Sequence, residues 1–344
     1  WENIVKQARA SHLLAILGYK IIDEQAVKVN PRIWHHFSSA MLVAEQHRYK
    51  TDIELKKLDA ILQEINLDAF VLKGAAYHIK DLDLAKGRTF SDIDLLFQKD
   101  HINTIENKLW FSGYLPAQED DYDKRYYREW MHEIPPLQHI KSKVVLDIHH
   151  NILPVTGKTT VDLHALLANP SKVSGLHAIK TFSDEAMILH SATHLFHEGE
   201  FEKGLRDLMD LASLLSDYIK KYQSLDSLIR VAKETNLGVP LFLATRYVEH
   251  IFELSILEND KTAIAQFFPS KLKLRILDFC FLNVFTPYHS SFHSKQKILA
   301  EFILLSRSHL LKMPLRLLIP HLLKKSFKSV KEKFSDKEKS TPTT

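Results

Sequence analysis

The stretch that decides the fold runs from Phe70-Val-Leu-Lys-Gly-Ala-Ala-Tyr77 to Ser91-Asp-Ile-Asp-Leu-Leu-Phe97. Its first part is an apolar run that ends in Lys73-Gly74, and it predicts a strand followed by a helix. The second part predicts another strand, in which successive side chains point to opposite faces. Asp92 and Asp94 therefore share one face, while the apolar residues between and after them share the other and can pack into a core.

Two carboxylates this close repel each other, and a divalent cation between them relieves the repulsion. Oxygen ligands on a rigid strand suit Mg²⁺, which keeps several waters and shares its coordination shell with phosphates. The turn at Lys73-Gly74 predicts the other half of such a site. A glycine lets backbone N–H groups approach a phosphate, and the following helix offers its N-terminus to the anion. We therefore expect Mg²⁺, with Mn²⁺ as the alternative ion.

The order of strand, glycine turn, helix and Asp-x-Asp strand resembles the nucleotidyltransferase superfamily that includes DNA polymerase β. A bacterial family labelled only as uncharacterised nucleotidyltransferase is more similar still, through Leu72-Lys-Gly-Ala-Ala76, Arg88-x-x-Ser-Asp-Ile-Asp-Leu-Leu96, Gly113-Tyr114 and Leu146-Asp-Ile-His-His150. The resemblance spans roughly residues 60–215. It implies an α+β fold in which a polymerase β-like mixed sheet is flanked by helices, with additional N- and C-terminal helical regions.

Members of the superfamily place a third carboxylate on a later strand, and the resemblance gives this role to Asp147. The alternative is a surface Asp on an edge strand. The resemblance implies that the metal and the catalysis depend on Asp92, Asp94 and Asp147. It implies that the nucleotide contacts Lys73, Gly74, Ala75, Arg88 and Ser91. Many members have serine after the glycine, so Ala75-Ala76 removes one hydroxyl contact to phosphate.

The function implied by the resemblance is transfer of a nucleoside monophosphate from an NTP such as ATP to an acceptor, with release of pyrophosphate. Small molecules, peptides, proteins and RNA all remain open as the acceptor. One alternative is a catalytically inactive member that binds a nucleotide or a partner, and another is a toxin that nucleotidylates its target. A phosphohydrolase with a metal on the histidines of 190–197 is a further alternative.

The composition is that of an ordinary globular protein, with 344 residues, 45% of them hydrophobic and 26% charged. The single cysteine, Cys280, lies in an apolar segment, which favours packing over a reactive thiol. A lone cysteine also excludes an internal disulfide and fits a reducing compartment. We see no signal peptide pattern and no apolar run of ~18 residues, so we expect no transmembrane helix and a cytoplasmic location.

The chain divides into four expected regions. These are an N-terminal helical region over 1–66, a nucleotidyltransferase catalytic core over 67–160, a C-terminal helical domain over 161–305, and a basic amphipathic helix with a disordered tail over 306–344. Within the core we expect strands over 69–73 and 92–98, helices over 75–84 and 101–112, and a hairpin of 132–140 with 143–150. From 160 to 300 the pattern predicts only helices.

Two polar motifs in the helical region have alternative interpretations. Ser183-Asp-Glu185 predicts the start of a helix that carries His190, His194 and His197. Positions i and i+4 share a helix face, so His190 and His194 are either metal ligands or packing and substrate contacts. The stretch Arg206-Asp207-x-x-Asp210 either contacts the base or the acceptor, or caps a helical bundle.

The C-terminal tail is the basic part of the chain. From Arg307 onward ten Lys and Arg face three Asp and Glu, whereas the whole chain has a net charge of only +4, so the body is slightly acidic. The body therefore does not have the charge of a nucleic-acid binder. Leucines interleaved with Lys and Arg in the tail indicate either a basic amphipathic helix in peripheral contact with an anionic membrane or a helix that docks on the core.

Overall fold

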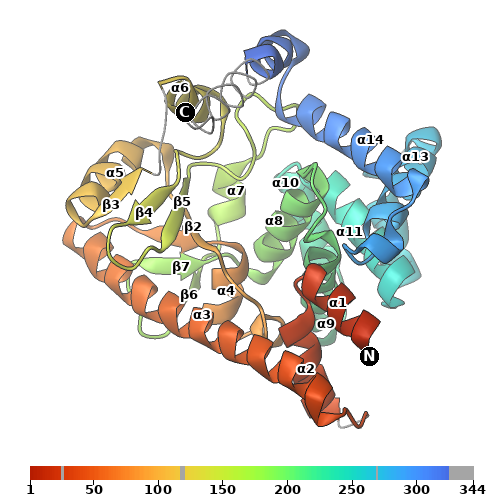
Figure 1. Cartoon of the computed structure of the whole chain (residues 1–344). Helices are drawn as coiled ribbons and strands as arrows, with labels where there is room; N and C mark the ends of the chain where they lie inside the picture. Colours follow the sequence, from red (N-terminus) through yellow and green to blue (C-terminus); the bar gives the residue numbers. More distant parts are fainter. Residues whose placement is uncertain (25–26, 117–120, 269, 325–344) are drawn as a thin grey trace, which may run out of the picture.

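A seven-stranded mixed sheet lies at the centre of the molecule, with the strand order β3-β4-β5-β2-β1-β7-β6 (Figure 1). The computed structural model describes residues 1–24, 27–116, 121–268 and 270–324. Its strands are β1 (Ala69–Val71), β2 (Asp92–Leu96), β3 (Tyr114–Pro116), β4 (Leu137–His139), β5 (Val145–His149), β6 (Ser171–Lys172) and β7 (Ile179–Thr181). β2 pairs with β5, and β1 with β7, in parallel, while the other pairs are antiparallel. The expected α+β fold is confirmed.

The two faces of the central strands follow from the alternation of their side chains. Ile93 pairs with Leu146 and Leu95 with Ile148, and all four side chains are buried. Residues paired across a sheet share a face, so these apolar residues form one continuous core face. The opposite face of the same strands then carries the aspartates.

Long and short helices surround the sheet (Figure 1). They are α1 (Glu2–Ala10), α2 (Leu14–Glu24), α3 (Pro31–Glu64), α4 (Lys73–Ile79), α5 (Ile102–Phe111), α6 (Asp121–Trp130), α7 (Leu163–Leu167), α8 (Asp184–His197), α9 (Gly204–Tyr222), α10 (Asp226–Glu234), α11 (Gly238–Phe252), α12 (Glu258–Ala265), α13 (Lys271–Val284) and α14 (Lys295–Lys312), with 3₁₀ turns η1 (Asp83–Ala85), η2 (Lys99–His101) and η3 (Ser290–Phe292). The predicted helix start at Ser183 is confirmed, because its hydroxyl accepts a hydrogen bond from the Ala186 amide.

Helix α3 is fixed to the sheet by a buried carboxylate. Asp59 is 4% exposed, and its Oδ1 accepts hydrogen bonds from the backbone amides of His177, Ala178 and Ile179 at 2.8–3.0 Å. A carboxylate that accepts several backbone bonds stays charged at little cost even when it is buried. This contact therefore connects the N-terminal helices to β7, on the far side of β1.

Helix α2 lies against the loop that leads to β2. Gly87 in this loop has φ +77°, and a Cβ there would lie 2.6 Å from the backbone nitrogen of Ile16. Only glycine combines this left-handed backbone with so close an approach. The N-terminal helices are thereby brought next to the segment that carries Arg88 and Ser91.

Two expectations about secondary structure are wrong. Residues 160–300 are not only helical, because β6 and β7 extend the sheet, with β7 directly beside β1. The first arm of the hairpin is also shorter than 132–140. It begins at Leu137, after Pro135-Pro136, which cannot donate backbone hydrogen bonds to the neighbouring strand. The short strand β3 was not predicted.

The C-terminal part of the described chain continues beyond α14 as a helical segment over 315–324. Its Leu318 and His321 are buried, and the His321 ring stacks on Tyr126 of α6 with 4.5 Å between centroids. Leu315, Ile319, Leu322 and Leu323 are exposed. One side of this segment thus docks on the protein. Membrane contact through the exposed side stays a prediction, and the predicted disordered tail lies outside the described residues.

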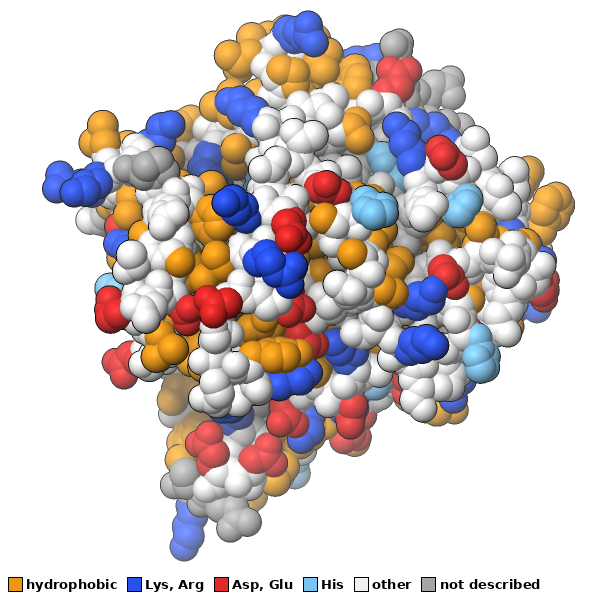
Figure 2. Space-filling model, turned by 180° about the vertical axis from the view of Figure 1, so that it is seen from behind, with side chains coloured by type: hydrophobic (Ala, Val, Ile, Leu, Met, Phe, Trp, Pro, Cys, Tyr) orange, Lys and Arg blue, Asp and Glu red, His pale blue; other side chains and the backbone are white. Residues whose placement is uncertain are grey.

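The described helices include none that is long and apolar enough to cross a bilayer. On the face opposite to the one in Figure 1, basic and acidic side chains are interspersed among hydrophobic ones (Figure 2). This distribution differs from the continuous basic surface that is typical of nucleic-acid binders.

Candidate active site

The sheet brings the three predicted carboxylates together. Asp94 of β2 lies directly opposite Asp147 of β5 in a parallel register, and Asp92 lies one pleat away on the same face. Neighbouring strands are about 4.8 Å apart, so the two opposed carboxylates are within reach of a common ligand. β5 lies between β4 and β2, so Asp147 is not on an edge strand.

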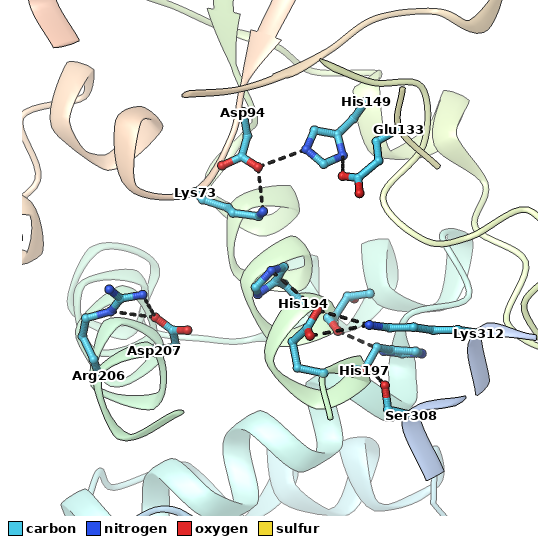
Figure 3. A network of polar contacts seen from close by, with 12 residues as sticks. Lys73, Asp94, Glu133, His149, His194, His197, Arg206, Asp207, Ser308 and Lys312 are labelled. Carbon is cyan, nitrogen blue, oxygen red and sulfur yellow. Dashed lines mark hydrogen bonds and ion pairs between the residues drawn. The ribbon is translucent and has the colours of Figure 1, made fainter. Parts of the chain in front are cut away.

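Asp94 is the centre of a network of polar contacts (Figure 3). The same oxygen, Oδ1, accepts a hydrogen bond from Lys73 Nζ at 2.6 Å and one from His149 Nε2 at 3.0 Å. Burial by itself raises the pKa of the Asp94 carboxyl, but Lys73 and His149 outweigh it and hold that pKa well below its usual range. Asp94 is therefore a carboxylate at any ordinary pH.

Lys73 is held in an unusual backbone conformation at the start of α4. Its φ is +49°, in the left-handed region that residues with a side chain rarely occupy. Such conformations persist where the surroundings enforce them, and they are common at functional sites. The next residue, Gly74, has no room for a side chain, because a Cβ would lie 2.7 Å from the Phe90 ring and 2.8 Å from Arg88 Nε.

Asp147 has a different charge environment from Asp94. Burial and the neighbouring carboxylates of Asp94 and Asp92 raise its pKa to about 7. Burial is the largest cause of this rise and the neighbouring carboxylates add to it, so a second negative charge beside Asp94 is unfavourable without a counter-ion. A set of carboxylate oxygens with excess negative charge fits a hard divalent cation such as Mg²⁺.

The stability of the metal-free protein should depend on pH through Asp147. Its pKa is about 7 in the folded chain against an ordinary value of 3.8, so the folded chain retains a proton that the unfolded chain loses. The stabilisation is complete below about pH 4 and is lost as the pH rises through about 7. In EDTA, we expect Tm to fall from about pH 5 to pH 8 more steeply in the wild type than in Asp147→Asn. Identical profiles for the two proteins would contradict this assignment.

A cavity of about 320 Å³ opens beside the carboxylates. One wall contains all five residues predicted to contact the nucleotide, together with two of the aspartates: Lys73, Gly74, Ala75, Arg88, Ser91, Asp92 and Asp94. The opposite wall is formed by α8 and α9 and includes Ser191, His194, Arg206, Asp207 and Asp210. The polar side of α9 thus faces the cavity, and the size is in the range of small-molecule sites.

Arg88 connects the two walls of the cavity. Arg88 is 7% exposed, and its guanidinium pairs with Asp210 and with Asp207 at 3.5 Å and lies 5.4 Å from the centre of the Tyr77 ring. Asp207 also accepts hydrogen bonds from Arg206 at 2.6 and 2.9 Å, so two arginines and two carboxylates balance one another here. Arg88 was expected to contact the nucleotide. Lys73 lies on the same wall as the aspartates and donates a hydrogen bond to Asp94, a predicted catalytic carboxylate.

The family model described as uncharacterised nucleotidyltransferase matches residues 1–253. The chain belongs to this family. The match includes the whole sheet, both walls of the cavity and every residue predicted for the site, while α13 and α14 lie beyond it. The chain is therefore a nucleotidyltransferase-like protein.

Among solved structures, the chain is similar to an antigenic nucleotidyltransferase-like protein from Paracoccidioides brasiliensis. The two share 15% sequence identity, with a TM-score of 0.30, and the match covers 53% of this chain and 93% of the other. A search of curated proteins finds no match.

Among the described residues, the histidines of α8 are not part of the group that geometry brings together as potential metal ligands. His190 packs edge-on against the Phe182 ring, and His197 Nδ1 is 2.9 Å from the Thr193 carbonyl oxygen. His194 lines the cavity. The structure therefore supports the packing interpretation for His190 and His197, and it leaves His194 in reach of a substrate.

Two polar residues of the site were not predicted from the sequence. His149 contacts Asp94, and Glu133 Oε2 lies 3.4 Å from His149 Nδ1 (Figure 3). The position of His149 had a signal, since it follows Asp147 by two residues and must share its face. Glu133 lies within the predicted arm 132–140 but was not singled out, and the structure joins it to His149 by an isolated bridge outside β4.

Proposed function

We propose that this protein transfers a nucleoside monophosphate from an NTP to an acceptor, with Mg²⁺ and release of pyrophosphate. The observation that carries the proposal is the register of β2 and β5, which places Asp147 opposite Asp94 on the face that bears Asp92. This face borders a cavity with Lys73-Gly74 in its wall. Asp92 and Asp94 line this cavity and Asp147 lies opposite Asp94, an arrangement that suits metal-assisted phosphoryl chemistry.

Asp92, Asp94 and Asp147 would hold the metal. A metal held there would offset the negative charge that builds up on the phosphate oxygens and would make the acceptor hydroxyl more acidic. Asp147 would take the proton of the acceptor hydroxyl, because Asp94 already accepts hydrogen bonds from Lys73 and His149. Lys73 keeps Asp94 ionised and in place through its hydrogen bond.

The cavity walls would divide the substrate between them. Gly74 and Ala75 line the wall next to the carboxylates, where their backbone N–H groups would bind phosphate oxygens. Asp207 on the α9 wall is partly exposed and would accept hydrogen bonds from the base or the acceptor. The triphosphate would then lie along α4, with the base or acceptor toward α9.

A thermal shift experiment tests this proposal. The wild type and the Asp92→Asn/Asp94→Asn double variant are melted with ATP, GTP, CTP or UTP, with and without Mg²⁺. A nucleotide at ~100 times its Kd should stabilise the protein by roughly 2.7 kcal/mol. We expect a Mg²⁺-dependent shift with at least one nucleotide that the double variant lacks. Absence of any shift would contradict the proposal and favour a catalytically inactive binder of a partner.

A labelled nucleotide then identifies the acceptor class. Label that moves to protein or RNA, together with growth arrest on expression that Asp94→Asn relieves, would indicate the toxin alternative. Label that moves to a small molecule or a peptide would exclude it.

A further inference from the structure

A second cluster of potential metal ligands lies beside the aspartates. Within the described parts of the chain, His132, Glu133 and His149 are a group whose ligand atoms all lie within 4.8 Å of one another. The two imidazole rings are stacked, with 5.3 Å between their centroids. None of the three belongs to the set of carboxylates assigned to Mg²⁺.

Two nitrogen atoms of this cluster make no hydrogen bond. Nδ1 of His132 and Nδ1 of His149 are both buried and make no hydrogen bond. Leaving a buried polar atom unpaired costs about 1–3 kcal/mol, so two of them side by side require an explanation. A cation bound between the two nitrogen atoms would explain why they are unpaired, because it would coordinate both lone pairs.

The tautomer of His149 points to the same conclusion. Nε2 lies 3.0 Å from Asp94 Oδ1, and because a carboxylate only accepts hydrogen bonds, the proton is on Nε2. Nδ1 therefore presents a lone pair toward Glu133 Oε2, 3.4 Å away. A cation between these two atoms, either a proton or a metal ion, would join them. In metal sites, a carboxylate often accepts a hydrogen bond from the histidine nitrogen that does not bind the metal, and so orients the ring. Asp94 makes this contact with His149 Nε2.

The cluster is built on a fixed backbone. The His150 amide donates to the His132 carbonyl at 2.7 Å, and the Ile134 amide donates to the Ile148 carbonyl at 2.9 Å. These bonds hold segment 132–134 against the end of β5.

We propose that His132, Glu133 and His149 bind a second metal ion, of the Zn²⁺ class, next to the three-aspartate site. Two imidazole nitrogens and one carboxylate are a ligand set typical of Zn²⁺ and other transition metals, whereas Mg²⁺ prefers oxygen ligands alone. His149 connects the two sites, because it contacts Asp94 through Nε2 and the cluster through Nδ1. The ion would hold His149 in place, and with it the Asp94 carboxylate.

Metal analysis of the full chain tests this site without any nucleotide. The protein is stripped with chelator, equilibrated with micromolar Zn²⁺ in excess Mg²⁺, and analysed for bound metal; Co²⁺ gives a visible spectrum as a second readout. We expect about one Zn²⁺ per chain in the wild type. Glu133→Gln and His132→Ala should lose it, while Asp147→Asn should keep it. His150→Ala, a buried neighbour outside the cluster, is the matched control and should also keep it.

Other outcomes overturn the proposal. These are no bound Zn²⁺ in the wild type, or unchanged binding in both Glu133→Gln and His132→Ala. Loss in Asp147→Asn with retention in Glu133→Gln would place the ion at the aspartates instead. Thermal melts of each variant distinguish loss of metal from loss of fold, and the partly exposed Glu133 provides the milder substitution. The nucleotide experiments above are independent of these results, so either proposal can fail alone.

Discussion

Asp94→Asn is expected to lower the rate of nucleotidyl transfer by at least ~100-fold. Asparagine keeps the shape of the side chain but removes the charge that would bind the metal and that now pairs with Lys73 and His149. Metal-ion stabilisation of a phosphoryl transition state is worth several kcal/mol, and a loss of ~3 kcal/mol corresponds to ~100-fold in rate. The measurement is single-turnover transfer of a labelled nucleotide at saturating Mg²⁺.

Asp100→Asn is the matched control for this substitution. Asp100 follows β2 in the chain, is exposed and lies outside the cavity, so its replacement should leave the rate unchanged. A melt of each variant separates lost chemistry from lost fold, because Asp94→Asn also leaves Lys73 without its partner. Activity in Asp94→Asn above about a tenth of the wild type would be incompatible with a metal site that depends on Asp94.

The second substitution with a large expected effect lowers the stability of the fold. It breaks the ion pair of Arg88 with Asp210, which joins the two walls of the cavity. Asp210→Asn should lower the free energy of unfolding by about 3 kcal/mol, the lower end of the cost of breaking a buried ion pair. Asp210 is 3% exposed and pairs with Arg88, which is 7% exposed, so the substitution leaves a buried guanidinium with Asp207 as its remaining carboxylate. Equilibrium unfolding in urea measures the change.

Asp217→Asn on the same helix provides the comparison. Its side chain is 57% exposed and pairs with Lys220 at 3.6 Å, and exposed pairs of this kind contribute ~0–1 kcal/mol. Equal losses in the two variants would show that the Arg88–Asp210 pair does not stabilise the fold. A selective loss in Asp210→Asn would show that α9 is attached to the nucleotide wall through this pair.

The part of the site that could be predicted is the part that depends on local pattern. Alternation within a single strand places Asp92 and Asp94 on one face, and the same rule applied to β5 places Asp147 on one face with His149. The parallel pairing that sets Asp94 opposite Asp147 came only from the resemblance, because a strand pattern carries no information about its neighbour. Glu133 was not predicted as a site residue, because its contact with His149 depends on an isolated bridge that forms only in the folded chain.

The short strands at the other edge of the sheet show a second limit. β6 has two residues and β7 has three, whereas a strand pattern needs about four to eight residues before its period can be recognised. Arg88 and α9 illustrate a third limit. The polar side of α9 was visible in the sequence, but Arg88, the buried partner of Asp210 on that side, lies far away along the chain. Which charges balance one another across the cavity is decided only when the chain folds, so the sequence does not show it.

The position of β1 has a consequence for how the protein is made. β1 is hydrogen-bonded to β2 on one side and to β7 on the other, although β7 follows it only at Ile179–Thr181. While the ribosome is still producing the segments between them, β1 offers an open edge of unpaired backbone groups, which attracts other chains. Every nascent chain therefore carries Asp92 and Asp94 of β2 beside a strand with an open edge until residue 181 has emerged.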